Sequence, residues 1–464
     1  MTSLHAGAAR VDITPTGPIL QAGFGQRTTP STGVHDPLFA KSLYLDDGRA
    51  RVLIVTTDLI CMPRPLADAV MARLSTATGL VGDEMVLCAS HTHSGPVPWD
   101  GAGGSEYHGT LVDALVRVGC DAVAAARRSR LRCGIGSADV FFNRRTRGAP
   151  NHVDRRIPVL AVEDAATGAL HAVAFGAGCH PVTLGWDNMQ ISADFPGVAQ
   201  AEVERALGVE NALFFNTTEG NVIPVTSPDR DALDPRGYCG GGWEHTLRIG
   251  RAIADAAVRT ALAAPISSEP RLSSARVDLS LAPNRADLSP DVLRARFEGA
   301  VATLRRHLGD EAVGRLSPST LWADASAHVV RHDLAEPDMR ELMIACCHYL
   351  GLLPRLRGVE RAARPVEVPV QVLAVDRFDF LALPGEVLVE VGDEWRRLTG
   401  NEHAFVIGLA NAHHRYLPRA LHFAEAEAAV RYETVTAGLA PDGVEIALRE
   451  AATLRATRTR ATGT

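Results

Sequence analysis

The first half of the chain alternates apolar, β-branched runs with segments whose apolar residues recur at helical spacing. The runs typical of buried strands cover residues 51–59, 84–89, 156–163 and 170–176. The segments typical of helices cover residues 65–74 and 109–127. Strands that alternate with helices bury their apolar faces by packing as layers. The sequence therefore predicts a layered α/β domain.

The second half of the chain contains a long stretch with a different pattern. Residues 288–355 are predicted to be mainly helical, beginning at Ser289 and Pro290, because serine caps helices and proline suits their first turn. Strand-like runs resume at 366–375 and 378–383. We expect one domain over residues 1–450, with 288–355 as a helical insertion, and a flexible polar tail over 453–464.

Composition and charge exclude several classes of function. The net charge is −7 and no basic stripe is present, which argues against a nucleic-acid partner. No run approaches the roughly 18 apolar residues that span a bilayer, so we expect no stable membrane association. The first residues lack the pattern of a secretion signal, and the 8 cysteines include no C-x-x-C pair. These features predict a cytoplasmic protein with reduced thiols and a small-molecule substrate; whether it forms a homo-oligomer is left open.

Two histidines follow the strand-like run 84–89. His91 and His93 are two positions apart, so they leave the strand on the same side, and the turn at Gly95 and Pro96 allows a ligand to approach. Zinc favours imidazole nitrogen ligands. A metal site and a pair of hydrogen-bonding loop histidines are both compatible with this pattern.

Two well-known kinds of H-x-H metal site do not match. The metallo-β-lactamase pattern continues H-x-H-x-D-H, whereas Gly95 and Pro96 occupy those places here. Barrel amidohydrolases with two metals bridge them with a lysine downstream of the histidines, and the only lysine, Lys41, lies upstream. Only a lysine-free version with one metal remains open.

Three other predicted strand ends also carry groups that can bind a metal. His180 follows the run 170–176, Glu386 follows 378–383, and the segment GLANA at 408–412 is followed by His413, His414, Arg415 and Tyr416. Each has an ordinary structural explanation by itself, such as a hydrogen-bonded core histidine or a carboxylate at a helix start. Their shared position at strand ends predicts that they meet in one site.

Alternative nucleophiles receive little support. Ser94 does not lie in a G-x-S-x-G turn between a strand and a helix. Cys179 and His180 are adjacent at a strand end, so their side chains point to opposite sides and form a poor catalytic pair.

The order of short motifs along the chain resembles the catalytic domain of the neutral/alkaline ceramidases. The resemblance spans roughly residues 7 to 440, and the family's additional β-sandwich domain is expected to have no counterpart in this short, divergent member. The motifs are GAARVDITP (7–15), GVHD (33–36), HTHSGP (91–96), FNR (142–144), GCH (178–180), SAD (192–194), EGNVIP (219–224), LPGE (383–386) and GLANA (408–412).

The resemblance implies layered mixed β-sheets flanked by helices and one Zn²⁺ per chain. It implies that zinc is held by His91, His180, Glu386 and Tyr416. It also implies catalytic roles for four further residues: His93 as a general base, Arg144 and Tyr432 as donors to a substrate oxyanion, and Asp194 as a carboxylate that orients a ligand histidine.

One position departs from the family in a way that concerns the substrate. The ceramidases carry a serine that contacts the sphingoid hydroxyl in a stretch Gly-Asp-Val-Ser-Pro, and Ile223 stands in its place here. We therefore predict a zinc-dependent hydrolase that cleaves an amide bond of a small soluble metabolite. The alternatives are ceramidase activity itself, ester or lactone hydrolysis, a zinc lyase reaction, and a non-catalytic binding protein.

Overall fold

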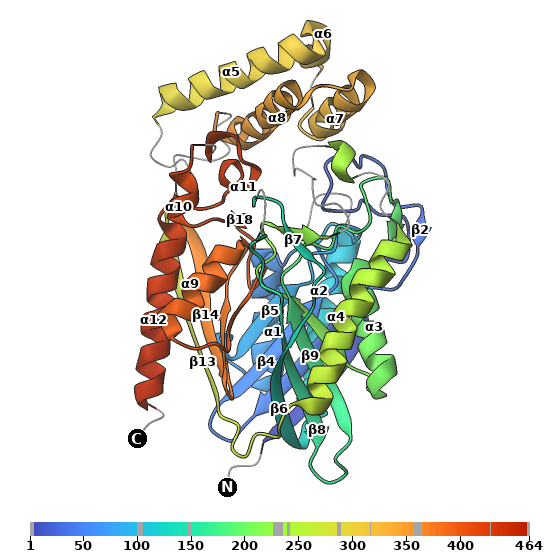
Figure 1. The fold of residues 1–464 in the computed structure, drawn as a ribbon, viewed down its shortest axis with the longest axis vertical. Helices are drawn as coiled ribbons and strands as arrows, with labels where there is room; N and C mark the ends of the chain where they lie inside the picture. Colours follow the sequence, from blue (N-terminus) through green and yellow to red (C-terminus); the bar gives the residue numbers. More distant parts are fainter. Residues whose placement is uncertain are drawn as a thin grey trace.

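Two β-sheets of different size form the centre of the molecule in the computed structural model (Figure 1). The structure describes residues 4–99, 105–146, 150–225, 235–238, 242–284, 289–315, 317–356, 364–426 and 428–461. The larger sheet has eight strands in the order β11 (Ala212–Asn216), β9 (Leu170–Ala177), β8 (Arg156–Asp164), β6 (Arg127–Ser137), β1 (His5–Asp12), β3 (Phe39–Asp46), β4 (Arg51–Thr57) and β5 (Met85–Ala89). The smaller sheet has four, in the order β13 (Leu272–Leu281), β14 (Val366–Val375), β15 (Phe378–Ala382) and β17 (Ala404–Ile407).

Both sheets are mixed. In the larger sheet, β5 runs parallel to β4 and β11 parallel to β9, while the other neighbours are antiparallel. In the smaller sheet, β17 runs parallel to β15. The predicted strands 51–59, 84–89, 156–163 and 170–176 are confirmed as β4, β5, β8 and β9. One apolar cluster contains buried side chains from both sheets, such as Ile54, Phe215 and Phe380, so the two sheets share a core.

Helices cover the outer faces of the sheets in three pairs, as the sequence predicts for a layered α/β domain (Figure 1). The helices α1 (Arg64–Thr78) and α2 (Ser105–Ala124) share an apolar cluster with the strands around β4. The helices α3 (Asp194–Leu207) and α4 (Trp243–Ala263) pack near β9 and β11. The helices α9 (Val389–Thr399) and α12 (Gly443–Ala461) cover the smaller sheet.

Three short strand pairs lie at one end of the sheets. They join β2 (Gly33–Val34) to β10 (Gln190–Ile191), β7 (Phe141–Asn143) to β12 (Val222–Pro224), and β16 (Glu386–Val387) to β18 (Tyr416–Leu417). Short helical turns complete this end, namely α10 (Ala420–Phe423), α11 (Tyr432–Val435) and the 3₁₀ turns at Pro235–Tyr238 and Ala428–Val430, while a third 3₁₀ turn, Gly82–Glu84, precedes β5.

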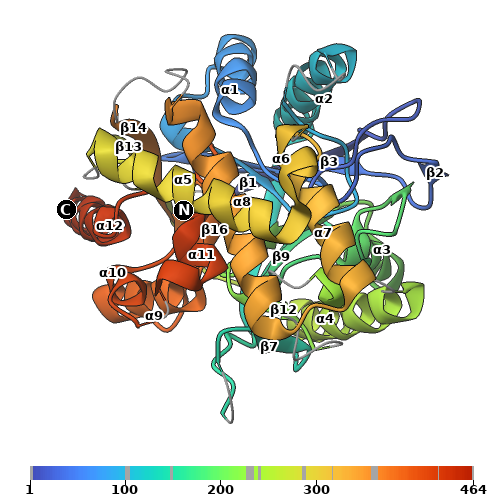
Figure 2. The same cartoon turned by 90° about the horizontal axis from the view of Figure 1, so that it is seen from above.

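The stretch that was predicted to be mainly helical forms four helices above this end, which Figure 2 shows from above. They are α5 (Pro290–Leu308), α6 (Asp310–Gly314), α7 (Leu321–His332) and α8 (Glu336–Leu356). The hydroxyl of Ser289 accepts a hydrogen bond from the Val292 amide and Pro290 occupies the first turn, as predicted. The helices share their own apolar cluster, which also includes Tyr432 and Val435 of α11.

The tail prediction was wrong for most of its length. Residues 453–461 continue α12 as helix, and 462–464 lie outside the described residues. The segment contains three arginines, two alanines and one leucine, which are strong helix formers, beside three threonines, and Leu454 packs against the cluster of the smaller sheet.

Two expectations about the chain concern membranes and thiols. Among the described helices, none combines the length and apolar character that crossing a bilayer requires. The cysteines that the structure describes are all free thiols, and the adjacent pair Cys346 and Cys347 is buried in the cluster of the insertion.

Candidate metal centre

His91 lies just beyond β5, where the loops after β4 and β5 meet. Its amide donates to the carbonyl of Leu59, and its backbone adopts a left-handed φ of 73°. The ring nitrogen Nδ1 lies 2.6 Å from the carbonyl oxygen of Ile60. Because Nδ1 must donate its proton to that oxygen, Nε2 carries a lone pair and is free to bind a cation.

His180 follows β9 and is held in the same way. Its amide donates to the carbonyl of Val222, and Nδ1 lies 2.7 Å from the carbonyl oxygen of Glu219. Gly178 allows this tight path, because a Cβ there would lie 2.9 Å from the carbonyl oxygen of Thr218. The Nε2 atom of His180 therefore also presents a lone pair. Burial lowers the pKa of His180 to about 4, so its ring is neutral near pH 7.

Glu386 and Tyr416 are paired directly by the parallel bridge between β16 and β18. The carboxylate Oε2 of Glu386 lies 3.2 Å from Nε2 of His180 and 3.5 Å from Nε2 of His91. The phenol oxygen of Tyr416 lies 3.3 Å from Nε2 of His180. The structure thus brings together all four side chains that the sequence resemblance implies as ligands.

The donor chemistry of this cluster fits a zinc ion. Two imidazole lone pairs, a carboxylate and a phenol converge within hydrogen-bond distances in a buried place, and zinc binds nitrogen and oxygen ligands of these kinds. Contacts with His91 and His180 outweigh burial and hold the pKa of Glu386 well below its usual value, so the carboxylate is ionised. Lone pairs and a negative charge that face one another repel, and a cation relieves that repulsion.

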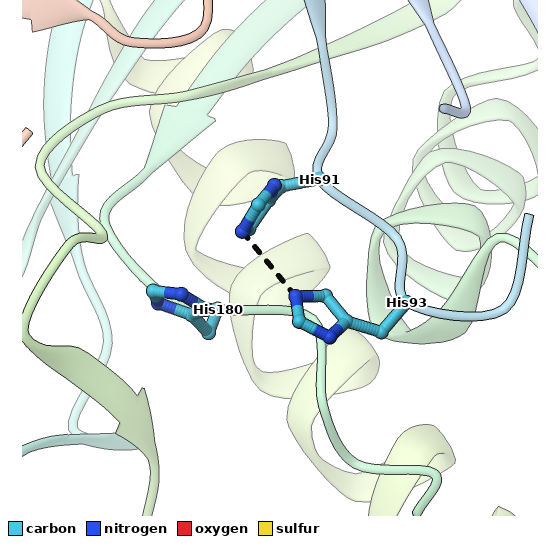
Figure 3. A group of neighbouring side chains, drawn as sticks. All are labelled: His91, His93 and His180. Carbon is cyan, nitrogen blue, oxygen red and sulfur yellow. Dashed lines mark hydrogen bonds between the residues drawn. The ribbon is translucent and has the colours of Figure 1, made fainter. Parts of the chain in front are cut away.

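His93 completes a group of three histidines, which Figure 3 shows with their rings directed toward one another. Its Nε2 lies 3.3 Å from Nε2 of His91, and the ligand atoms of the three rings lie within 4.8 Å of one another. The position depends on Gly23, because a Cβ there would lie 2.6 Å from the His93 ring. The geometry therefore places His93 either as a further ligand or as a base beside the metal.

Arg144 and Tyr432 both lie beside this cluster. The guanidinium of Arg144 donates to the carbonyl of Gly220 at 2.9 Å and to the phenol oxygen of Tyr416 at 3.2 Å. The rings of Tyr432 and Tyr416 have centroids 5.4 Å apart. Both predicted residues line the same cavity as His93 and His180.

Asp194 does not have the predicted contact with a ligand histidine. Its carboxylate accepts hydrogen bonds from Thr183, from the amide of Leu184 and from its own neighbour Phe195 at the start of α3. The carbonyls of Ile60 and Glu219 orient the two ligand rings instead. The hydrogen bonds from Thr183 and Leu184 tie Asp194 to the chain segment that follows His180. Sequence alone does not reveal this, because backbone carbonyls carry no motif.

Two supporting residues were not found from the sequence. Glu433 receives a hydrogen bond from Arg144 at 3.0 Å, and Arg27 donates to the backbone carbonyl of His93. Burial alone would raise the pKa of Glu433, but Arg144 and Arg145 outweigh it and hold that pKa below its usual value. Glu433 directly follows Tyr432, and this adjacency is the only sequence signal that points to it.

A cavity of about 300 Å³ opens onto the centre. Its walls come from the loop at Phe24, from the cluster itself and from the helical insertion, which contributes Trp322 and Leu350. The sequence did not predict that the insertion contributes to the cavity wall, since nothing in the sequence indicates which face of those helices turns toward the centre.

These observations define a layered α/β domain with a buried candidate metal centre at the ends of its strands.

The chain is 23% identical to the neutral ceramidase of Mycobacterium tuberculosis, in an alignment that covers 85% of this chain and 68% of that protein. It shares the fold of the crystal structure of neutral ceramidase from Pseudomonas aeruginosa, with a TM-score of 0.70, 20% identity, and coverage of 97% of this chain and 74% of that one. A second ceramidase structure, described as complexed with C2, gives a TM-score of 0.71 at 18% identity, covering 98% and 76%.

No known family model matches the chain. The chain nevertheless resembles a neutral ceramidase in sequence and has the fold of the neutral ceramidase structures. The resemblance and the fold class that the motifs predict are therefore confirmed.

Gly385 offers a test of how the loop that carries Glu386 is built. A Cβ at Gly385 would lie 2.3 Å from the carbonyl oxygen of Arg415, which accepts the Glu386 amide proton. We expect Gly385→Ala to destabilise the protein by about 1–3 kcal/mol and to weaken zinc binding, because the backbone must move. Thermal unfolding with and without zinc measures both effects.

Gly299 serves as the matched control. It lies within α5 and a Cβ there would meet nothing within 4 Å, so Gly299→Ala should leave zinc binding unchanged and raise stability by up to about 1 kcal/mol. Equal behaviour of the two variants would contradict the proposed role of Gly385.

Proposed function

We propose that this protein is a zinc-dependent hydrolase that cleaves an amide bond of a small soluble metabolite. The observation that carries the proposal is the convergence of His91, His180, Glu386 and Tyr416 at the inner end of a cavity. Zinc held by these side chains would supply a Lewis acid that polarises a carbonyl group and lowers the pKa of water. The relation to the neutral ceramidases supports amide hydrolysis as the reaction.

His93 is suited to move the proton in this reaction. Burial lowers its pKa well below the usual value, so the ring is neutral near pH 7 and can accept a proton. Its Nε2 faces the cluster and its ring lines the cavity. It would take the proton of the attacking water and return it to the leaving nitrogen, as a general base and then a general acid.

Arg144 and Tyr432 are suited to stabilise the tetrahedral oxyanion. The ion pair with Glu433 keeps the Arg144 guanidinium fixed beside the Tyr416 phenol. Burial raises the pKa of Tyr432, so its phenol keeps a proton to donate. Donors held in place before the reaction stabilise developing charge without having to reorganise.

The contribution of Tyr432 can be measured with Tyr432→Phe, which removes only the hydroxyl group. We expect kcat to fall by roughly 10²–10³, the usual effect of removing one oxyanion donor, while zinc content stays the same. Steady-state kinetics and elemental analysis check this. An unchanged kcat would remove Tyr432 from the oxyanion site.

The cavity supports a small substrate. Its volume of about 300 Å³ is at the lower end of the range for small-molecule sites. Ile223 is 1% exposed and packs with Val182, which lines the cavity, so an apolar side chain occupies the place of the family's serine. An isoleucine offers no hydrogen bond to the hydroxyl of a sphingoid base.

The proposal is tested by turnover of a substrate panel with zinc-loaded protein. The panel contains small N-acyl amines, N-acyl amino acids, matched esters and lactones, and ceramide. We expect the small amides to be cleaved faster than the esters and ceramide. Cleavage of ceramide alone, at rates typical of enzymes, would overturn the small-substrate proposal, and no cleavage by zinc-loaded protein would overturn the hydrolase.

A further inference from the structure

Arg415 is a charged residue in the cavity wall to which the proposed reaction assigns no role. It lines the cavity together with Arg144, His93 and His180, and it is the residue immediately before the ligand Tyr416. Its side chain is exposed. A solvent-accessible arginine is thus built into the loop that carries one of the metal ligands.

The guanidinium of Arg415 makes no hydrogen bond or ion pair with any residue that the structure describes. The other cavity arginine differs, because Arg144 is neutralised by Glu433 at 3.0 Å. The described residues that line the cavity include no aspartate or glutamate. The Arg415 charge in this wall is therefore uncompensated and available to an anion that enters the cavity.

The backbone fixes where this side chain leaves the loop. Arg415 has a left-handed φ of 56°, a conformation that costs free energy for a residue other than glycine. Its carbonyl accepts the Glu386 amide at 2.8 Å, and the next residue pairs with Glu386 in the bridge between β16 and β18. The loop that carries Arg415 and Tyr416 therefore fixes the Cα and Cβ atoms of Arg415 relative to the centre.

The lining of the cavity also has an apolar part. Trp322 and Leu350 of the insertion and Phe24 line it. A ligand that fills the cavity would therefore meet both an aromatic and aliphatic surface and the positive charge of Arg415.

We propose that the substrate is an amide that also carries an anionic group, and that Arg415 binds this group while the amide lies at the metal centre. The proposal rests on the proposed function and specifies its substrate class. Carboxylate and phosphate-type anions both suit an arginine fork, and an amide of this class is more polar than a ceramide.

The test measures binding rather than turnover, so it remains informative even if amide hydrolysis fails. The probe is N-methanesulfonylphenylalanine, whose sulfonamide replaces the amide and is not a hydrolase substrate. The corresponding alcohol, N-methanesulfonylphenylalaninol, is the neutral counterpart and has no bond that an amide hydrolase cleaves, and the phosphonate analogue separates phosphate from carboxylate preference. Calorimetric titration of zinc-loaded full-length protein gives the Kd of each probe.

We expect the wild-type protein to bind at least one anionic probe more tightly than the neutral one. Arg415→Gln should reduce that preference by roughly tenfold to a hundredfold, the usual effect of losing a charged hydrogen bond, and Arg415→Lys should retain part of it. Binding of the neutral probe shows that the pocket of each variant is folded.

Arg117→Gln is the matched control, since Arg117 is 74% exposed on α2 and pairs only with the nearby Asp121 among described residues. It should keep the wild-type preference. No preference for either anion in the wild-type protein, or an equal preference in Arg415→Gln, would overturn the inference and leave the hydrolase proposal standing. If the zinc-loaded wild-type protein cleaved no amide but still preferred an anion through Arg415, the hydrolase proposal would be overturned and Arg415 would remain an anion-binding residue.

Discussion

Glu386→Gln is expected to release most of the bound zinc and to abolish amide hydrolysis. Glutamine keeps the size of the side chain and loses the negative charge that faces the Nε2 atoms of His180 and His91 at 3.2 and 3.5 Å. Changing a partner outside the ligand shell already costs roughly 10- to 100-fold in metal affinity, so losing a ligand charge should cost more. Elemental analysis after dialysis against a weak chelator, together with zinc titration, measures the loss.

The same substitution at Glu394 provides the control. Glu394 lies on the same helix that follows the ligand, α9, and pairs with Arg397 and Arg419 at the surface. Glu394→Gln should retain one zinc per chain and wild-type activity. If Glu386→Gln also retained its zinc, the ligand set would be wrong and the hydrolase proposal would lose its basis.

His93→Gln is expected to lower kcat by roughly 10²–10⁴, the range that a general acid–base residue contributes. Glutamine fills a similar space but cannot carry a proton between water and the leaving nitrogen. Zinc should stay at one per chain, because the proposed ligands are unchanged. Steady-state kinetics and elemental analysis of the same sample give both values.

The zinc content of this variant also separates the two roles that the geometry allows for His93. Its Nε2 lies only 3.3 Å from that of His91, a distance compatible with a shared cation. If His93 were a ligand, the variant would lose zinc in parallel with activity. A variant with full zinc and full activity would exclude both roles.

Much of the fold could be predicted from the sequence because its strands are apolar runs with clear ends. Residues 51–59 and 170–176 are mostly buried, and continuous apolar runs of this short length are typical of buried strands. The start of the insertion could also be predicted, since Ser289 and Pro290 form a standard helix start. Residues 453–461 were misassigned because a polar composition was taken to indicate a flexible tail, although arginine, alanine and leucine, which favour helix, outnumber the threonines there.

The candidate site could be predicted from the residue types at strand ends, whereas the residues that surround it in the cavity could not. His91, His180 and Glu386 each follow a strand, so their meeting could be expected from topology alone. The direct pairing of Glu386 with Tyr416 depends on a two-residue bridge that has no sequence pattern. The contribution of Trp322 to the cavity depends on how the insertion packs on α11, which is a tertiary contact between segments about 110 residues apart.

The helices of the insertion have a cluster of buried apolar side chains separate from those of the two sheets. Substitutions that reshape α7 or α8 therefore leave the strands that carry the metal ligands intact. Apart from Tyr432, which packs against this cluster, the proposed reaction centre lies outside it, so the cavity wall can vary while the strands beneath stay the same. Related chains could keep the proposed hydrolytic centre and act on new substrates by altering only the insertion above it.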